Sequence, residues 1–158
     1  MMNDVKYIKG DATQPKQEGN KIIVHVCNDI GGWGKGFVMA ISKRWKAPEK
    51  EYRNWYKTKE NFNLGEVQFI QVEEDLWVAN LIGQHKVRKD ENGNPPIRYE
   101  AIQLGLQKVY EKAKELNASV HMPRIGCGLA GGTWDKIEPL IIKELIKKSI
   151  STTVYDFD

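Results

Sequence analysis

Two glycine-dense segments hold the residues whose types and spacing bear most directly on chemistry. Residues 28–36 read NDIGGWGKG and residues 124–132 read RIGCGLAGG. Each follows a strand-like run and leads into a helix-like run. Glycine leaves backbone N–H groups uncovered, and such groups at the start of a helix favour an anion such as a phosphate. One such loop is as readily a plain strand-to-helix turn, but two in one small domain predict a phosphate-containing ligand.

The spacing within these two loops argues against the common nucleotide-hydrolysing sites. Neither loop fits the P-loop pattern G-x-x-x-x-G-K-[ST], and neither presents G-x-G-x-x-G in the dinucleotide-binding setting. Nucleotide hydrolysis of the P-loop kind is therefore not expected. Residue pattern alone leaves the class of the phosphate-containing ligand open.

Strand-like and helix-like patterns alternate around the two loops. Residues 21–27 (KIIVHVC) form a near-continuous apolar run, which is typical of a buried central strand. We expect further strands at residues 5–8, 65–72, 76–82, 119–122 and 152–157. Helices are expected after Gly36 through residue 45 and at 49–59, 97–116 and 134–148, and residues 86–96 are expected to form the longest loop. This order predicts one three-layer α/β domain, residues 1–158, with helices on both faces of the sheet.

Composition bounds the class of protein. The 158 residues are 41% hydrophobic and 28% charged, with a net charge of +3, which is ordinary for a globular domain. The charge is too small to indicate a nucleic-acid partner, and the basic run at residues 143–148 is interpreted as a solvated helix face. No signal peptide and no apolar stretch of about 18 residues is found, so no membrane partner is expected. Cys27 and Cys127 are expected to be reduced thiols in a cytoplasmic protein, although a disulfide between them stays open.

Four strings in the sequence resemble macrodomains. They are YIKGDAT near the start, HVCNDIGGWGKGF and MPRIGCGLAGGTW at the two loops, and TVYDF at the end. They occur in the family's order and span nearly the whole chain. The closest resemblance is to the Appr-1''-p processing branch, which holds the ADP-ribose 1''-phosphate phosphatases and the terminal ADP-ribose–protein hydrolases. The resemblance implies a three-layer α/β/α fold with a central mixed sheet and a site for ADP-ribose.

The resemblance also implies a role for each residue that matches the family's binding motifs. Asp11 matches the acid that accepts a hydrogen bond from the adenine amino group, with turn capping as the alternative. Asn28 would lie near the distal ribose, and Tyr155 would pack against the adenine unless it is a plain sheet aromatic. The two loops would hold the diphosphate through the backbone of Gly126, Cys127, Gly128 and Leu129 on one side and of Gly34, Lys35 and Gly36 on the other. Cys127 is expected there for its size and backbone, not as a nucleophile.

The sequence departs from the family at two positions that matter for chemistry. Members that remove ADP-ribose from proteins use a lysine after the Leu-Ile of the middle strand and an aspartate after RIGCGL. The matching positions here are Gln84 and Ala130, so no amine is present to form a Schiff base with the opened ribose. Lys86 and Asp135 lie nearby but not at the motif positions. A lysine-dependent deglycosylase is therefore not favoured.

The phosphatase members match the first loop better, because a histidine precedes x-Cys-Asn there. His25 is the matching residue, and an imidazole could assist proton transfer to the leaving sugar oxygen or orient water against the phosphate. The alternative is a histidine packed inside the strand. Asp29 is the neighbouring carboxylate that could orient His25 or activate water. His85 and His121 have no motif support and are interpreted as structural or surface residues.

No cofactor or metal is expected. His25, Cys27, His121 and Cys127 have no zinc-like spacing. The leading hypothesis is a phosphatase acting on ADP-ribose 1''-phosphate. Two alternatives stay open: a module that binds ADP-ribose without chemistry, and a hydrolase that removes ADP-ribose from modified protein or nucleic acid. The expected partners are ADP-ribose, its 1''-phosphate, or an ADP-ribosylated macromolecule.

Overall fold

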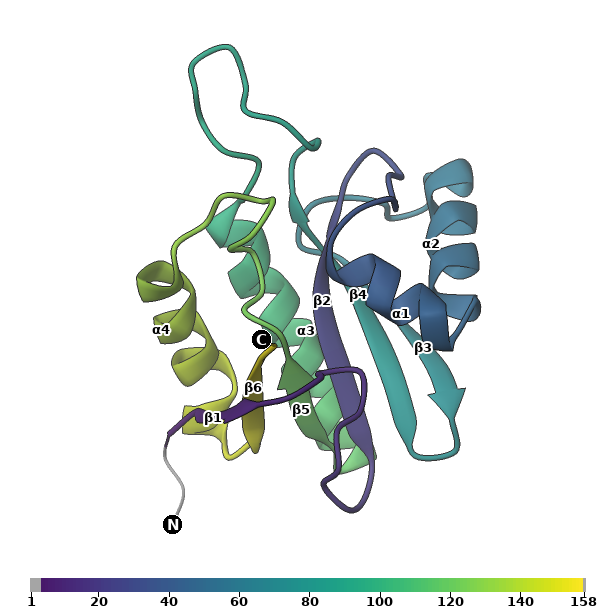
Figure 1. The fold of residues 1–158 in the computed structure, drawn as a ribbon, viewed down its shortest axis with the longest axis vertical. Coiled ribbons are helices and arrows are strands. Elements are labelled where there is room, and N and C mark those ends of the chain that lie inside the picture. Colours follow the sequence, from purple (N-terminus) through teal and green to yellow (C-terminus); the bar gives the residue numbers. More distant parts are fainter. Residues whose placement is uncertain (1–3, 158) are drawn as a thin grey trace.

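Strand β2 (Lys21–Asn28) forms the centre of the molecule, as its apolar run predicts. In the computed structural model, which describes residues 4–157, β2 pairs in parallel with β4 (Leu76–Gln84) on one side and with β5 (Ser119–Met122) on the other. Nearly all of its residues are buried, because helices cover both faces of the sheet here. Figure 1 shows β2 running between the two pairs of helices.

Six strands make one mixed sheet. The strand order is β1-β6-β5-β2-β4-β3, with β1 (Lys6–Lys9) at one edge and β3 (Val67–Glu73) at the other. Strand β6 (Thr152–Asp156) pairs in parallel with β1 and β5, and only β3 runs antiparallel to its neighbour β4. The predicted mixed sheet is confirmed.

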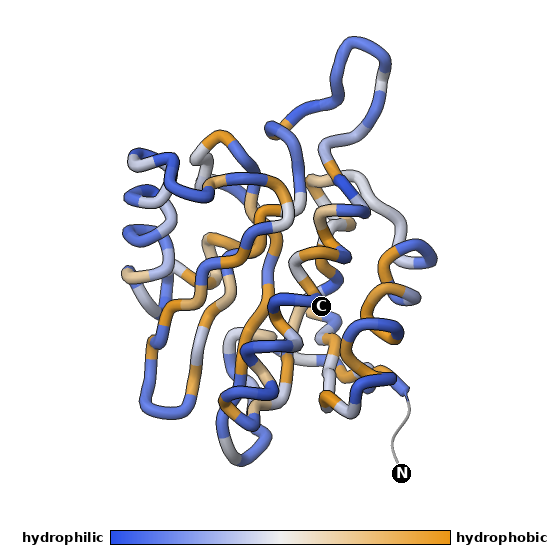
Figure 2. Tube along the Cα trace, turned by 180° about the vertical axis from the view of Figure 1, so that it is seen from behind, coloured by the Kyte–Doolittle hydropathy of each residue, from blue (hydrophilic) through white to orange (hydrophobic). Residues whose placement is uncertain are grey.

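Two helices pack on each face of the sheet. Helices α1 (Phe37–Arg44) and α2 (Ala47–Thr58) cover one face, and α3 (Tyr99–Leu116) and α4 (Trp134–Glu144) cover the other. Side chains of β2 alternate between the two layers: Ile23 packs toward α1 and α2, whereas Val24 packs toward α3 and α4. In Figure 2 apolar colouring is frequent on the strands and on helices α3 and α4, whereas α2 is mostly hydrophilic in colour. The three-layer α/β/α architecture is confirmed.

The observed elements differ from the predicted ones mainly at their ends. The last helix ends at Glu144, and a short 3-10 helix (Ile146–Lys148) follows, where a helix to residue 148 was predicted. Glu144, Leu145 and Ile146 are all buried, and three consecutive residues cannot all face inward from one regular helix. Helix α3 begins at Tyr99 because Ile97 is held beside β4 in an isolated bridge to Gln84.

The chain leaves β2 and β5, which are neighbours, toward opposite faces of the sheet. After β2 it enters α1 on one face, and after β5 it enters α4 on the other. Such a divergence opens a crevice at the carboxyl ends of the strands, where ligands of α/β proteins usually bind. The two glycine loops, residues 28–36 and 124–132, lie on either side of this point. Among residues 4–157, no helix has both the length and the apolar character needed to cross a membrane.

Candidate functional site

A cleft of about 630 Å³ lies where the two glycine loops face each other. Both loops contribute to its wall, together with the ends of β2 and β4 and the start of the segment after β4. The predicted site residues on this wall are His25, Asn28, Gly34, Lys35, Gly36, Gly126, Cys127, Gly128 and Leu129. Three others, Asp11, Asp29 and Tyr155, are not among the residues that line it.

The first glycine loop is folded around the side chain of Asn28. Its Oδ1 accepts hydrogen bonds from the N–H groups of Ile30 (3.0 Å) and Gly32 (2.9 Å), and its Nδ2 donates to Gly32 O (2.9 Å). The buried hydroxyl of Tyr52, on α2, donates to the carbonyl oxygen of Asn28 at 2.6 Å. Asn28 therefore organises the loop as well as lining the cleft.

The second glycine loop closes on itself through its own backbone. Gly132 N donates to Gly126 O (2.8 Å), and Gly131 N donates to Cys127 O (3.0 Å). A Cβ on Gly132 would lie 2.4 Å from Gly126 O, so only glycine permits this closure. The side chain of Leu129 reaches across toward the first loop, 3.4 Å from where a Cβ of Gly36 would be. The two loops thus approach each other over the cleft.

Backbone N–H groups of both loops are available to a ligand. Within residues 4–157, those of Gly34 and Lys35 in the first loop and of Gly128 and Leu129 in the second have no hydrogen-bond acceptor. A Cβ on Gly34 or Gly128 would meet nothing within 4 Å, so both positions border open space. This arrangement of unpaired donors is the one that the sequence predicts for an anion.

The charges on the cleft wall have one sign. Lys35, Arg88 and Arg124 line the cleft, and no aspartate or glutamate does. Arg124 is neutralised by a bidentate pair with Asp156, at 2.6 and 3.0 Å. Lys35 and Arg88 form no ion pair within the described part of the chain. Arg88 was not predicted from sequence, because the segment that carries it has no periodicity or motif.

His25 is held inside the sheet with one ring nitrogen unpaired. Its Nε2 lies 2.5 Å from Oδ1 of Asn80, and Asn80 Nδ2 donates to Pro48 O, so Nε2 must carry the proton. Nδ1 is buried and is the one buried side-chain nitrogen or oxygen in the described region without a partner. Burial lowers the pKa of His25 to about 4, so the ring is neutral at pH 7 and Nδ1 carries a lone pair. Trp33 and Phe37 pack against the ring.

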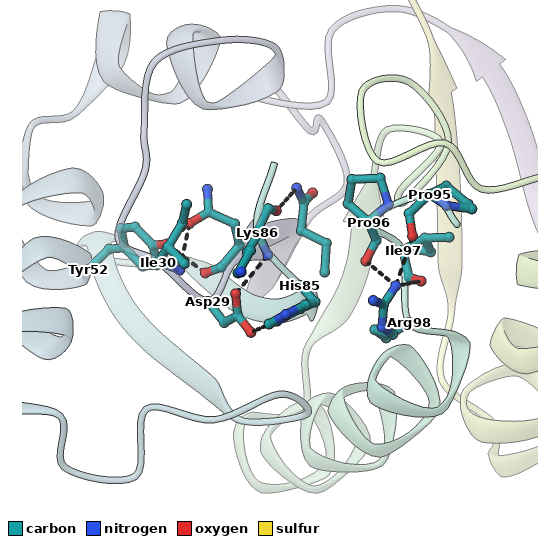
Figure 3. A network of polar contacts seen from close by, with 11 residues as sticks. Asp29, Ile30, Tyr52, His85, Lys86, Pro95, Pro96, Ile97 and Arg98 are labelled. Atoms are coloured by element: carbon teal, nitrogen blue, oxygen red, sulfur yellow. Dashed lines mark hydrogen bonds and ion pairs between the residues drawn. The ribbon is translucent and has the colours of Figure 1, made fainter. Parts of the chain in front are cut away.

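Asp29 does not contact His25. It lies beyond the end of β2, where its Oδ2 pairs with His85 Nδ1 (2.7 Å) and its Oδ1 accepts from Lys86 N (2.8 Å). Figure 3 shows Asp29 between these two residues. The expected orientation of His25 by Asp29 is therefore absent, and Asn80 on β4 takes that place, which no sequence motif indicates. His85 is thus the histidine that contacts Asp29.

The predicted contacts for the adenine end are engaged within the protein. Asp11 Oδ1 accepts from the backbone N and hydroxyl of Thr13, at 2.8 and 2.7 Å, and Oδ2 pairs with Arg44 at 3.4 Å. Tyr155 is buried, and its hydroxyl contacts His121 Nδ1 at 2.7 Å, so it serves the sheet. Phe157, two residues on, is 80% exposed. The sequence gave no signal for this exposed aromatic residue beyond the TVYDF string.

The two positions that differ from the deglycosylase pattern both line the cleft. Gln84 donates from Nε2 to Lys86 O at 2.8 Å, and the buried Ala130 accepts at its carbonyl oxygen from Ile97 N at 3.0 Å. Asp135 lies in the first turn of α4 and is not on the cleft wall. Gln84 and Ala130 thus leave both positions without an ionisable side chain.

The cysteines of the cleft are free thiols. Cys27 is buried and Cys127 is half-buried, and burial raises the pKa of both. A raised pKa disfavours the thiolate, so neither is activated as a nucleophile. Among residues 4–157, no three His, Cys, Asp or Glu side chains cluster in a way that could hold a metal ion.

Comparisons with known proteins bear on the family and the fold of the chain. A scan against models of protein families finds no match. The structure is similar to that of a protein of unknown function from Bacteroides thetaiotaomicron, with a TM-score of 0.96 and 59% identity over 97% of this chain and 98% of that one. It is also similar to a macrodomain protein from Streptomyces coelicolor, with a TM-score of 0.87 and 53% identity over 97% of this chain and 99% of that one.

Curated relatives include one much longer protein and one that matches along nearly its whole length. The mouse chromodomain-helicase-DNA-binding protein 1-like is 35% identical over 97% of this chain, which spans only 18% of that protein. An ADP-ribose 1''-phosphate phosphatase from Lodderomyces elongisporus is 26% identical over 98% of this chain and 99% of its own length. With the fold, the paired glycine loops and a full-length match at 53% identity in agreement, the chain belongs to the macrodomain family.

Proposed function

We propose that this macrodomain binds ADP-ribose and hydrolyses ADP-ribose 1''-phosphate to ADP-ribose and inorganic phosphate. The observation that carries the proposal is the pair of glycine loops with unpaired N–H groups on either side of a cleft that has cations and no carboxylates on its wall. A diphosphate presents two negative charges and several acceptor oxygens to such donors.

The sheet order suggests how a ligand of this length would lie. Gly10 N donates to Asp156 O, so Asp11 and the exposed Phe157 lie at the carboxyl end of β6. From β6 the order passes through β5 and β2, which carry the glycine loops, to β4. Three strand spacings cover about 14 Å. We assign the adenine to the β6 end, the diphosphate to the glycine loops and the distal ribose to the β4 end, with Phe157 in place of Tyr155 as the aromatic that a base can stack on.

His25 supports a hydrolytic step as a base. Because its pKa is lowered to about 4, Nδ1 carries no proton at pH 7, and the proton on Nε2 is held by Asn80, so the role of proton donor to the leaving oxygen is not favoured. Nδ1 can instead accept a proton from water as the water oxygen attacks phosphorus. The bond between phosphorus and the sugar oxygen then breaks, and that oxygen takes a proton from solvent. Water and phosphomonoester give ADP-ribose and inorganic phosphate.

The relatives support the same choice. The Lodderomyces phosphatase matches along nearly its whole length, so the similarity covers the complete domain of that enzyme. Gln84 and Ala130 also remove the groups on which the lysine-dependent deglycosylase reaction depends.

Two measurements test the proposal. Calorimetric titration with ADP-ribose should show one site per chain, and incubation with ADP-ribose 1''-phosphate at pH 7 should release inorganic phosphate. His25→Gln should abolish phosphate release while ADP-ribose affinity stays within about threefold, because the side chain lies behind the binding loops. Phosphate release no faster than from His25→Gln would reject the catalytic part, and absence of ADP-ribose binding would reject the whole proposal.

Binding without chemistry is the second candidate. The observation that favours it is the enclosure of His25, whose side chain is packed against Trp33 and Phe37 and whose residue is 1% exposed. In this candidate the ring serves the packing of β2 and takes no part in chemistry. This candidate predicts calorimetric binding of ADP-ribose together with no turnover of its 1''-phosphate or of ADP-ribosylated proteins and nucleic acids.

A further inference from the structure

The segment after β4, residues 85–97, is an ordered arm that stands above the cleft. We call it the arm; it is the teal loop that projects from the sheet in Figure 1. At its base, His85 N donates to Pro96 O (2.8 Å), and Arg98 Nη1 donates to the carbonyl oxygens of Pro95, Pro96 and Ile97 at 2.8–3.0 Å. Figure 3 shows Arg98 among these carbonyls.

The tip of the arm is also fixed by hydrogen bonds. The carboxylate of Asp90 accepts from the backbone N–H groups of Asn92 and Asn94, both at 2.9 Å, and Gly93 N donates to Asp90 O at 3.0 Å. The arm also packs on the second glycine loop, where a Cβ on Gly131 would lie 2.7 Å from Cβ of Pro95. Hydrogen bonds therefore fix the base and the tip of the arm, and Pro95 packs the arm against the second glycine loop.

A tight turn at Lys86 directs the arm toward the cleft. Lys86 has a φ of +61°, a left-handed conformation that costs a non-glycine residue about 1–2 kcal/mol. Side chains hold both of its backbone polar groups: Asp29 accepts from its N–H, and Gln84 donates to its carbonyl oxygen. Val87 and Arg88, the next two residues, line the cleft. Asp29 and Gln84 thus act as positioning residues for Arg88.

Arg88 is a cation placed to meet an anion. It lies on a wall without carboxylates, and within the described residues its guanidinium has no hydrogen bond or ion pair. It comes from the strand end at which the proposed function puts the distal ribose, whereas the glycine loops already supply donors for the diphosphate. A guanidinium matches phosphate oxygens through two parallel N–H donors.

We propose that Arg88 is a specificity residue that binds a phosphate on the distal ribose, beyond the diphosphate. This inference rests on the proposed function. It makes ADP-ribose that carries a terminal phosphomonoester the preferred ligand class over unsubstituted ADP-ribose. Asp29 and Gln84 act through Arg88 by holding the turn at Lys86.

The test compares two ligands, ADP-ribose and ADP-ribose 1''-phosphate, by calorimetry in a His25→Gln background that prevents turnover. Arg88→Gln should weaken binding of the 1''-phosphate about tenfold and change ADP-ribose affinity by less than about twofold. Arg88→Lys should give an intermediate loss, because it keeps the charge without the fork. Lys89→Gln, one residue further along the arm and not on the cleft wall, is the matched control and should change neither affinity.

Asp29→Ala tests the positioning role. It should reproduce the selective loss of 1''-phosphate affinity, with ADP-ribose binding retained as evidence of an intact fold. If the His25→Gln background does not fold, the same substitutions are made in the protein that retains His25. There, KM for the 1''-phosphate replaces the calorimetric affinity if the protein turns this ligand over, and calorimetry is used if it does not. The inference is overturned if Arg88→Gln weakens binding of both ligands equally or has no effect on either. In both cases, binding of ADP-ribose by the parent protein leaves the proposed function standing. Failure of the parent protein to bind either ligand rejects both.

Discussion

At the scale of single residues, Gly126 and Gly128 of the second loop have different roles. Gly126 has a φ of +73°, and a Cβ there would lie 2.6 Å from Cδ1 of Ile97. Gly128 has ordinary backbone angles and borders only open space. The first glycine is required by the fold, and the second leaves room for a ligand.

This difference predicts opposite outcomes for the same substitution. Gly126→Ala should lower the free energy of unfolding by about 1–3 kcal/mol, from backbone strain and the contact with Ile97. Gly128→Ala should leave it within about 0.5 kcal/mol but weaken ADP-ribose binding about tenfold, by filling space at the diphosphate. Urea unfolding and calorimetry of the pair check this. A Gly128→Ala protein that binds normally would mean that the ligand does not approach this backbone.

Two buried histidines link stability to pH. Burial lowers the pKa of His25 and of His121 to about 4, and the charges of Lys21 and Lys6 add to the effect at His121. In the unfolded chain both would titrate near 6.5. The unfolded state therefore binds more protons between pH 4 and 6.5. The stability that these residues provide is complete above pH 6.5 and is lost as the pH falls toward 4.

As the pH is lowered from 7 to 5, protonation linked to each of these histidines should decrease the free energy of unfolding by about 2 kcal/mol. Urea denaturation at the two pH values measures the loss. His121→Gln, which removes the titrating ring beside Ser119 and Tyr155, should reduce the pH-dependent loss by about 2 kcal/mol whatever its effect at pH 7. The same loss in the variant and the parent would show that His121 is protonated in the folded state.

At the scale of elements, the first glycine loop depends on a side chain at the end of β2 and on α2. Asn28 supplies three hydrogen bonds to the loop backbone, and Tyr52 fixes Asn28 from α2. The binding loop is thereby coupled to the packing of α2 on the sheet.

Graded substitutions of Asn28 should separate these contacts. Asn28→Ala removes all the side-chain bonds and should lower stability by about 2–3 kcal/mol and ADP-ribose affinity at least tenfold. Asn28→Asp keeps the acceptor for Ile30 and Gly32 but loses the donor to Gly32 O, so we expect about half the loss of stability. Thermal unfolding with calorimetry gives both quantities. An affinity that stays unchanged in Asn28→Ala would show that the loop keeps its shape without this side chain.

At the scale of the whole molecule, charge is distributed so that the site differs from the surface. The chain has 24 basic and 21 acidic residues, yet the cleft wall carries only basic ones. Away from the cleft wall, several carboxylates pair with basic side chains, as Asp75 does with Lys21 and Glu49 with Arg53. A nearly neutral protein can therefore attract an anionic small molecule locally.

This distribution predicts a salt effect confined to the cleft. Raising NaCl from about 50 to 500 mM should weaken ADP-ribose binding about tenfold, because exposed charges are screened. Lys35→Gln should reduce this salt dependence. Lys147→Gln, at an exposed residue of the 3-10 helix after α4, should leave it unchanged. Equal effects of both variants in salt titrations would point to net charge as the cause.

The sequence by itself determined the order and type of the elements and the position of the binding loops. Three of these features can be read from local sequence. They are the apolar run of β2, the spacing of apolar residues in α3, and the glycines that a strand-to-helix turn requires. The same local reasoning put both glycine loops at one site, because the carboxyl ends of parallel strands meet at one edge.

Only the tertiary structure decided which side chains are free to act. Asp29 turned out to hold the arm, Asn80 to orient His25, and Tyr155 to bond His121, because partners far apart in sequence meet across neighbouring strands. Arg88 reached the cleft through a turn at Lys86 that depends on Asp29 and Gln84. Periodicity reports which face a residue occupies. The hydrogen-bond partners and the burial that set its chemistry depend on the rest of the fold.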